Sequence, residues 1–171
     1  LQAALTGHLV LSTYHASSAA VAITRLMDAI GENPLYASAI RLIQAQRLVR
    51  SLDNKTKREI SISPELRKHI GKIVDGIEAD VDLSFLSDVH LYEPGSSEQN
   101  PFGYDGQFAI RELLTMSPDM QKLLTTSYNG VSTEEIEKVA VKNGMLTMEQ
   151  DGILRALKGD TTIEEITRVI G

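Results

Sequence analysis

The chain has 171 residues, 42% of them hydrophobic, which is enough for one domain or for a domain with a small appendage. It contains no cysteine, so neither a disulfide nor a thiolate-ligated metal site can form. The formal net charge of −6 argues against a general nucleic-acid or anionic-membrane binder. Because the sequence also lacks a long apolar run and a signal-peptide pattern, we expect a cytosolic protein.

Polar and titratable side chains follow an apolar run near the start of the chain, in residues 6–15. The apolar run is Leu-Val-Leu at residues 9–11, which predicts a strand buried on both faces of a parallel sheet. Ser12, Thr13 and His15 would then lie at the carboxyl end of that strand, where open α/β sheets bind their ligands. Hydroxyls and an imidazole suit a phosphate-bearing ligand. A histidine after a buried strand can equally be a satisfied structural residue.

Two helices and a strand are predicted between residues 17 and 52. Ser17-Ser18 can cap a helix that runs to about residue 30 and ends at Gly31. Pro34 then opens a second helical pattern that reaches residue 43. Residues 47–52 alternate charged and apolar side chains, which favours a strand.

Residues 53–106 read as an insertion with its own small apolar core. A capping hydroxyl at Ser63 precedes Pro64, which predicts a helix to about residue 77 with apolar residues along one side. Residues 89–92 alternate as a short strand, and residues 94–102 form a loop rich in Pro, Gly and Ser. Residues 108–110 favour another strand that runs into residues 112–114.

Four helices are predicted after residue 114. Ser117-Pro118 begins the first, and two capping boxes follow, Ser132 with Glu135 and Thr147 with Gln150. A fourth pair, Thr162 with Glu165, caps the last helix. We expect these helices to form a small bundle. The sequence contains no P-loop, and no Walker B strand precedes Thr6.

Three blocks of the sequence resemble motifs of the secretion ATPases that drive type II secretion and type IV pilus assembly. Residues 6–13, followed by His15, are similar to the family's His box, T-G-H-L-V-x-S-T-L-H-T-N. Residues 45–50 resemble A-Q-R-L-V-R, and residues 103–114 resemble G-Y-x-G-R-x-x-I-x-E-L-L. The blocks occur in the family's order. The His box departs from the pattern at positions 14, 16 and 17, where Tyr, Ala and Ser replace Leu, Thr and Asn.

The resemblance implies an α/β fold: the C-terminal part of a RecA-like ATPase domain, followed by a mainly helical C-terminal domain. Residues 1–52 would belong to the ATPase core and carry the His box. Residues 53–114 would be the insertion equivalent to the family's metal-binding subdomain. Many members carry a tetracysteine zinc module there, but this chain lacks every cysteine, so we expect no zinc. Residues 115–171 would form the helical bundle.

The resemblance also implies a nucleotide site that uses ATP and Mg²⁺ in the intact protein. Its catalytic candidates are His8 and His15. The candidates for contacting the nucleotide are Thr6, Gly7, Ser12, Thr13, Arg47 and Arg50. The two arginines can instead be solvated, paired with carboxylates or placed at a subunit interface. No residue of this chain is expected to be a metal ligand.

The intact protein would be a homo-hexameric motor on the cytoplasmic side of the inner membrane, working with a membrane platform protein. We expect neither nucleic-acid binding nor membrane insertion. Without Walker A and Walker B the chain should not hydrolyse ATP alone. The alternative is a helical docking module for the platform protein or a neighbouring subunit. An unrelated hydrolase that uses His15 with Ser12 is disfavoured, because no third group orients the pair. The sequence does not distinguish pilus, secretion and competence systems.

Overall fold

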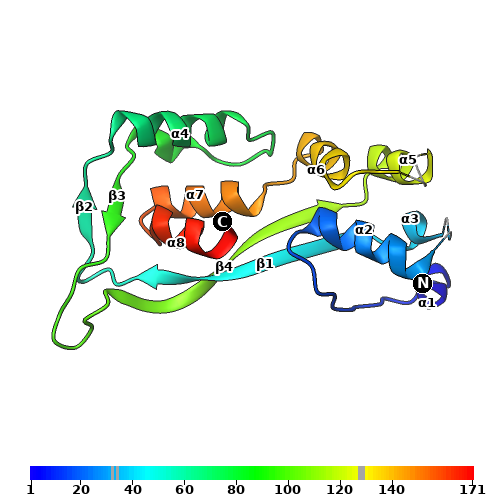
Figure 1. Ribbon diagram of the computed structural model, residues 1–171, viewed down its shortest axis with the longest axis horizontal. Coiled ribbons are helices and arrows are strands. Elements are labelled where there is room, and N and C mark those ends of the chain that lie inside the picture. The colour runs from blue at the N-terminus through cyan, green and yellow to red at the C-terminus, as the bar shows by residue number, and fades with distance from the viewer. Residues whose placement is uncertain (32, 34, 127–129) are drawn as a thin grey trace. The chain divides into compact units, whose positions relative to one another are not determined.

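A computed structural model describes residues 1–31, 33, 35–126 and 130–171. Its contacts divide the chain into two units, the first made of Leu1–Ala45 with Glu112–Met145 and the second of Gln46–Arg111 with Leu146–Gly171. Strand β1 (Leu42–Leu52) pairs with β4 (Tyr104–Thr115), and both strands contribute residues to each unit (Figure 1). The domain boundaries predicted after residues 52 and 114 differ from this division and stay predictions about the protein family's domains.

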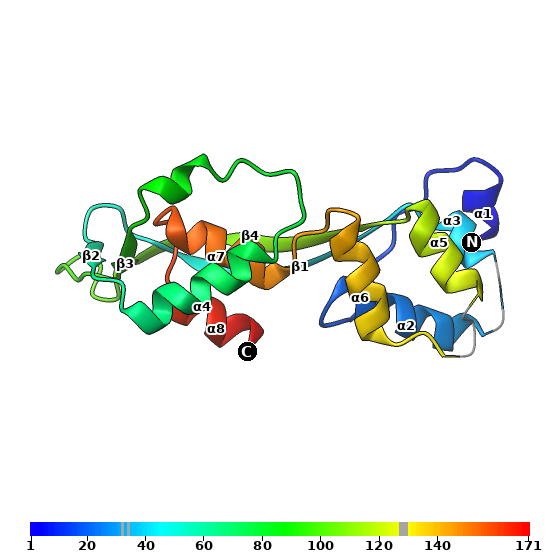
Figure 2. The same ribbon diagram turned by 90° about the horizontal axis from the view of Figure 1, so that it is seen from above.

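The first unit is helical. It contains α1 (Gln2–Leu5), α2 (Ala19–Ile30), α3 (Tyr36–Ala39), α5 (Pro118–Thr126) and α6 (Thr133–Lys142). Helix α6 packs across α2 (Figure 2). The core of the unit includes Ile23, Leu114, Met120, Leu124 and Ile136, all fully buried. The Tyr36 hydroxyl donates to the carbonyl of Leu124 at 2.9 Å, so the aromatic side chain fills the core without leaving its polar end unpaired.

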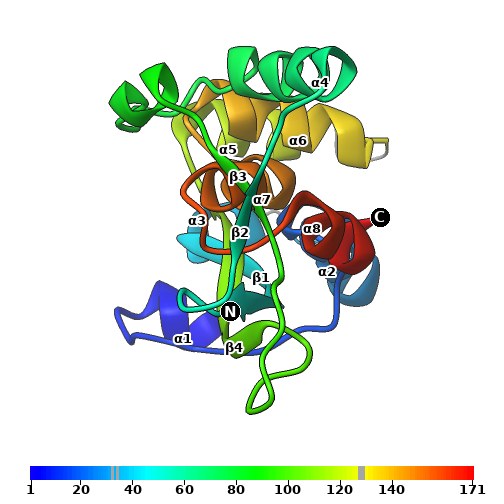
Figure 3. The same cartoon turned by 90° about the vertical axis from the view of Figure 1, so that its left-hand side faces the viewer.

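The second unit combines a pair of short strands with helices. Its elements are β2 (Arg58–Ile60), α4 (Pro64–Asp75), the 3-10 helix η1 (Ser84–Ser87), β3 (Leu91–Glu93), α7 (Met148–Leu157) and α8 (Ile163–Ile170). Strands β2 and β3 are antiparallel, with Ile60 opposite Leu91 (Figure 3). Helix α4 packs on α7 around Ile70 and Ile153. Helix α7 approaches α8 at Gly152, where a Cβ would lie 2.9 Å from the Ile166 side chain.

Five of the predicted helix starts are confirmed, those at Ser18, Ser63, Ser132, Thr147 and Thr162. The Ser18, Ser63, Thr147 and Thr162 side chains each accept a backbone N–H of the first turn. Complete capping boxes join Ser132 with Glu135 and Thr147 with Gln150. The strand predicted at residues 47–52 lies within β1, and the one predicted at 108–110 lies within β4.

Two predictions of local structure are wrong. Residues 9–11 form no strand and are exposed, because no described strand pairs with them. The helical pattern expected up to residue 43 ends at Ala39, and Leu42 begins β1, where pairing with β4 overrides the helical spacing. Pro34, the expected start of that helix, lies outside the described residues. Helix α4 ends at Asp75, two residues before its predicted end.

The last four helices pack in pairs. Helix α5 contacts α6 in the first unit, and α7 contacts α8 in the second. A common bundle of residues 115–171 stays a prediction.

Candidate functional site

Residues 6–15 leave α1 through a turn that fixes the first of their two histidines. Gly7 has a φ of +91°, a backbone conformation that glycine adopts readily. The backbone N–H of His8 donates to the carbonyl of Ala3 at 3.1 Å. The Thr6 hydroxyl lies 3.1 Å from Nδ1 of His8 and donates to the same Ala3 carbonyl at 2.9 Å. Because this hydroxyl already donates to Ala3, it accepts a hydrogen bond from Nδ1–H of His8, which leaves Nε2 as the nitrogen available to a ligand.

The apolar run that follows is open to solvent. Leu9 and Leu11 are 88% and 86% exposed, and Val10 is 50% exposed. The expected placement of the following polar side chains at the end of a buried strand is therefore not seen. Ser12 is exposed in irregular backbone.

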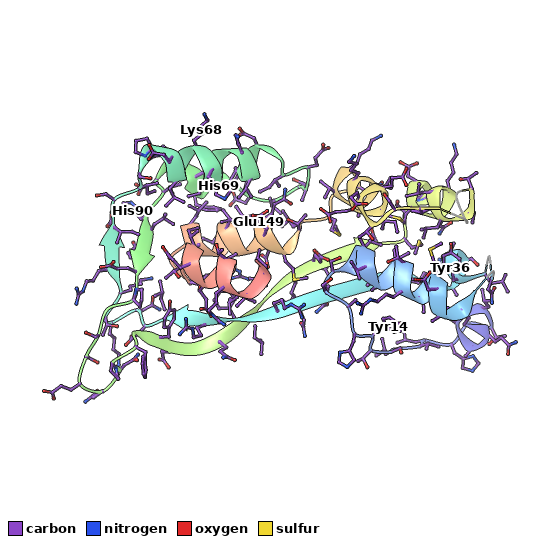
Figure 4. All side chains as sticks on the ribbon, viewed as in Figure 1. Tyr14, Tyr36, Lys68, His69, His90 and Glu149 are labelled. Carbon is purple, nitrogen blue, oxygen red and sulfur yellow. The ribbon has the colours of Figure 1, made fainter. Side chains whose placement is uncertain are left out.

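The end of the segment is tied to helix α2. The Arg25 guanidinium donates from Nη1 to the carbonyl of His15 at 2.8 Å, and the Tyr14 hydroxyl donates to the carbonyl of Arg25 at 3.3 Å. Figure 4 shows Tyr14 on the extended segment that runs beside α2. These reciprocal bonds hold the segment against the helix, although neither His15 nor Arg25 is buried.

A hollow lies where the segment and α2 meet. It is lined by Thr13, Tyr14, His15 and Arg25. A hydroxyl, an imidazole and a guanidinium are groups that bind phosphate oxygens, since each can donate a hydrogen bond and the guanidinium is always charged. The lining contains no carboxylate, so its donor set fits an anion and not a cation.

The structure brings together only some of the predicted site residues. Thr13 and His15 share the hollow, whereas His8 and Ser12 are not part of its lining. Arg47 is exposed on β1 in the second unit. Arg50, also on β1, donates to the carboxylate of Glu165 at 2.6 Å and is thus paired within that unit.

Arg25 is a candidate that the sequence patterns did not single out. It lies in the second turn of α2, a helix that Ser18 caps. The available signal was its place among the few charged residues of the first fifty positions, ten residues after His15. No spacing rule connects a helical arginine to a loop histidine ten residues earlier.

No group of three or more His, Cys, Asp or Glu that could hold a metal ion occurs among residues 1–31, 33, 35–126 and 130–171.

His90 is paired with two carboxylates: its Nδ1 lies 2.6 Å from Glu59, and its Nε2 lies 2.9 Å from Asp88. The hydrogen bond to Glu59, then that to Asp88, raises the pKa of His90 above its usual 6.5. Figure 4 shows His90 beside the β2–β3 pair and His69 on α4. None of the described helices has the length and apolar character needed to cross a membrane.

The chain belongs to the Type II/IV secretion system protein family, whose model matches residues 1–168. It is 41% identical to the type II secretion system protein E of Xanthomonas campestris pv. campestris, over 99% of this chain and 28% of that protein. It is 37% identical to the type IV pilus assembly ATPase PilB of Thermus thermophilus, over 96% of this chain and 17% of that protein. PilB of Pseudomonas aeruginosa is 33% identical over 99% of the chain. The chain thus spans less than a third of these relatives' length.

Proposed function

We propose that this chain is the C-terminal portion of an ATPase motor that powers type IV pilus assembly or type II secretion. The observation that carries the proposal is the family match over residues 1–168, with relatives named as a pilus assembly ATPase and as a secretion protein E. The intact protein would be a homo-hexamer that binds ATP with Mg²⁺. It would work at the cytoplasmic face of the inner membrane against a platform protein.

In this proposal the hollow at residues 13–15 faces the phosphates of ATP. Hydrolysis of ATP depends on positioning and on stabilising negative charge, since the protein forms no covalent bond. His15 would hydrogen-bond the γ-phosphate or the attacking water, and Thr13 would donate its hydroxyl to a phosphate oxygen. Arg25 carries a full positive charge on the same hollow and fixes the His15 backbone. His8, with Thr6, Gly7 and Ser12, would approach the nucleotide from the preceding turn.

The test is ATP hydrolysis by the intact protein, wild type against His15→Ala. We expect a loss of at least about a hundredfold in kcat, the effect typical of removing a group that acts on the transferred proton or phosphate. His69→Ala is the matched control, because His69 is exposed on α4 in the second unit. It should hydrolyse ATP like wild type.

Arg25→Gln removes the positive charge from the same hollow and the hydrogen bond from Nη1 to the His15 carbonyl. Because Arg25 is exposed, we expect weaker ATP binding with an unchanged fold. Equal turnover by wild type and His15→Ala would make the histidine structural and overturn its proposed role.

A helical docking module is the second candidate, and the exposed acids of α6 favour it. Glu134 and Glu137 lie exposed on this amphipathic helix, whose buried side holds Ile136 and Ala140. A docking module would bind its partner protein in titrations and ignore nucleotide. Two results together would favour docking over the motor. The chain would bind its partner equally well with and without ATP, and the intact protein would not hydrolyse ATP.

A further inference from the structure

A carboxylate is buried at the start of the last helix. Glu165 lies in the first turn of α8 and is 1% exposed. Its Oε2 accepts from Nε of Arg50 at 3.0 Å, from Nη2 of Arg50 at 2.6 Å and from Nε of Arg168 at 2.8 Å. Its Oε1 accepts from the backbone N–H of Arg50 at 3.0 Å and from Nη2 of Arg168 at 2.6 Å. Both oxygens are thus saturated with charged and backbone donors.

Arg50 reaches this carboxylate from β1 with a fixed orientation. Its guanidinium carbon lies 4.0 Å from the centre of the Tyr104 ring on β4. A flat guanidinium that stacks on a ring while two of its N–H groups donate to one oxygen, Oε2 of Glu165, has little rotational freedom left. The hydrogen bond to Glu165, which outweighs the lowering effect of burial, raises the pKa of Arg50. The Arg50 guanidinium is therefore held by its contact with Glu165 of α8.

The backbone around Arg50 is bound to the chain that leads into α8. The Thr161 hydroxyl, fully buried, donates to the Arg50 carbonyl at 2.8 Å. The backbone N–H of Leu52 donates to the carbonyl of Asp160 at 2.9 Å. Arg50 thus contacts α8 through its side chain and its N–H, and its carbonyl contacts Thr161 just before that helix.

We propose that Arg50 is a positioning residue that holds helix α8 on strand β1 through Glu165, and that it does not contact nucleotide. The second half of this inference rests on the proposed function, because it presupposes a nucleotide site. It takes Arg50, one arginine of the A-Q-R-L-V-R block, out of the set of residues that would contact the nucleotide. Arg47, exposed on the same strand, is left as the arginine of that block that is open to a ligand or a neighbouring subunit. Arg168 is the second clamp on the carboxylate, from within α8.

The experiment measures amide hydrogen exchange and ATP kinetics of the intact protein in one set of variants. Arg50→Gln and Glu165→Gln should each accelerate exchange in α8 by at least about tenfold, since the helix loses its anchor. The double variant should exchange no faster than either single one. Arg50→Lys should recover part of the protection, because an ammonium can pair with the carboxylate but cannot form the two-pronged contact. Arg47→Gln, the matched control, should leave exchange in α8 unchanged.

The kinetic measurement distinguishes anchoring from nucleotide contact. We expect the KM for ATP to be the same in Arg50→Gln as in Glu165→Gln, because both variants lose the same contact. A KM raised in Arg50→Gln alone, with wild-type exchange in α8, would overturn the inference. If Arg50→Gln does not fold, the comparison of Arg50→Lys with wild type decides in the same way. The exchange measurement stands even where the intact wild type proves inactive, so failure of the motor proposal and failure of this one are distinguishable.

Discussion

Glu165 keeps a negative charge where a carboxyl group would ordinarily take up a proton. Burial raises the pKa of its carboxyl group, but the hydrogen bonds from Arg168 and Arg50 outweigh burial and lower that pKa from 4.5 to about 2. The guanidinium groups therefore supply more than the free energy that dehydration of the carboxylate costs. The charge of this one residue makes the stability of the second unit depend on pH.

Acid should weaken the fold through Glu165. Because the pKa is lower in the folded chain than in the unfolded one, the stabilisation is complete above about pH 4.5 and is lost as the pH falls to about 2. We expect Glu165→Gln to cost on the order of 2–3 kcal/mol of unfolding free energy at neutral pH. The difference from wild type should shrink through that acid range. Urea unfolding at a series of pH values measures it.

Glu164→Gln is the control for this acid dependence, because Glu164 is the exposed neighbour in the same helical turn. It should follow the wild-type curve. A Glu165→Gln curve parallel to wild type from neutral pH down to about pH 2 would contradict the assigned pKa.

Helix α4 is held on α7 by apolar contacts. Ile70, 7% exposed, lies in the cluster with Ile153 and Leu157, and the Gln150 side chain donates to the Gly76 carbonyl at the end of α4 at 3.0 Å. Figure 4 shows Lys68 directed away from this contact. The helix therefore has one face that packs and one that is solvated.

Ile70→Asp should release α4 from the second unit. A carboxylate placed in this apolar contact would have no partner, so we expect a loss of about 3 kcal/mol or more and rapid protease cleavage within residues 61–90. Limited proteolysis followed by mass spectrometry locates the cuts. Lys68→Asp places the same carboxylate on the exposed face of α4 and should resist protease like wild type. Unchanged resistance in Ile70→Asp would remove α4 from the apolar core.

Helix starts, which depend on neighbouring residues, could be predicted from the sequence, whereas the burial of residues 9–11 and the exact start of β1 depend on distant partners and could not. The Ser63-Pro64 start and the two capping boxes depend on atoms three residues apart. Residues 9–11 carry the apolar character of a buried strand, but burial requires a covering partner that no local pattern supplies. Leu42 and Ile43 fit the helical spacing, yet they pair with β4.

The same distinction applies to the candidate site across the whole molecule. Thr13 and His15 were predicted from a contiguous motif and share one hollow, but the buried strand expected before them is not seen, and their contact with a nucleotide stays a prediction. Arg25 requires the tertiary contact of a loop with a helix. The partner of Arg50 lies 115 residues away, and a motif containing an arginine says nothing about which carboxylate it binds. The sequence could propose candidate residues, whereas the pairing of residues is a property of the fold.

A clip of hydrogen bonds joins two loops of the second unit, around Asp53 and Asn100. The Asn100 amide donates to Oδ2 of Asp53 and to the Tyr104 carbonyl, both at 3.1 Å, and its oxygen accepts from the Gly103 N–H at 3.1 Å. The Asp53 N–H donates to the Gly103 carbonyl at 3.0 Å. A bond from the Lys55 N–H, which outweighs burial, lowers the pKa of Asp53 and keeps it an acceptor. The two loops are thus joined without thiolates.

We therefore expect the unfolding temperature of the whole chain to be independent of metal. Treatment with EDTA should leave Tm within about 1 °C, since a bound metal would otherwise add stability by mass action. Asn100→Ala should lower Tm by about 3–8 °C, because the Gly103 N–H and the Asp53 carboxylate each lose a partner. Asn54→Ala, exposed in the same turn as Asp53, is the control and should melt like wild type. A Tm that falls with EDTA and returns with Zn²⁺ would show that a metal, and not this clip, joins the two loops.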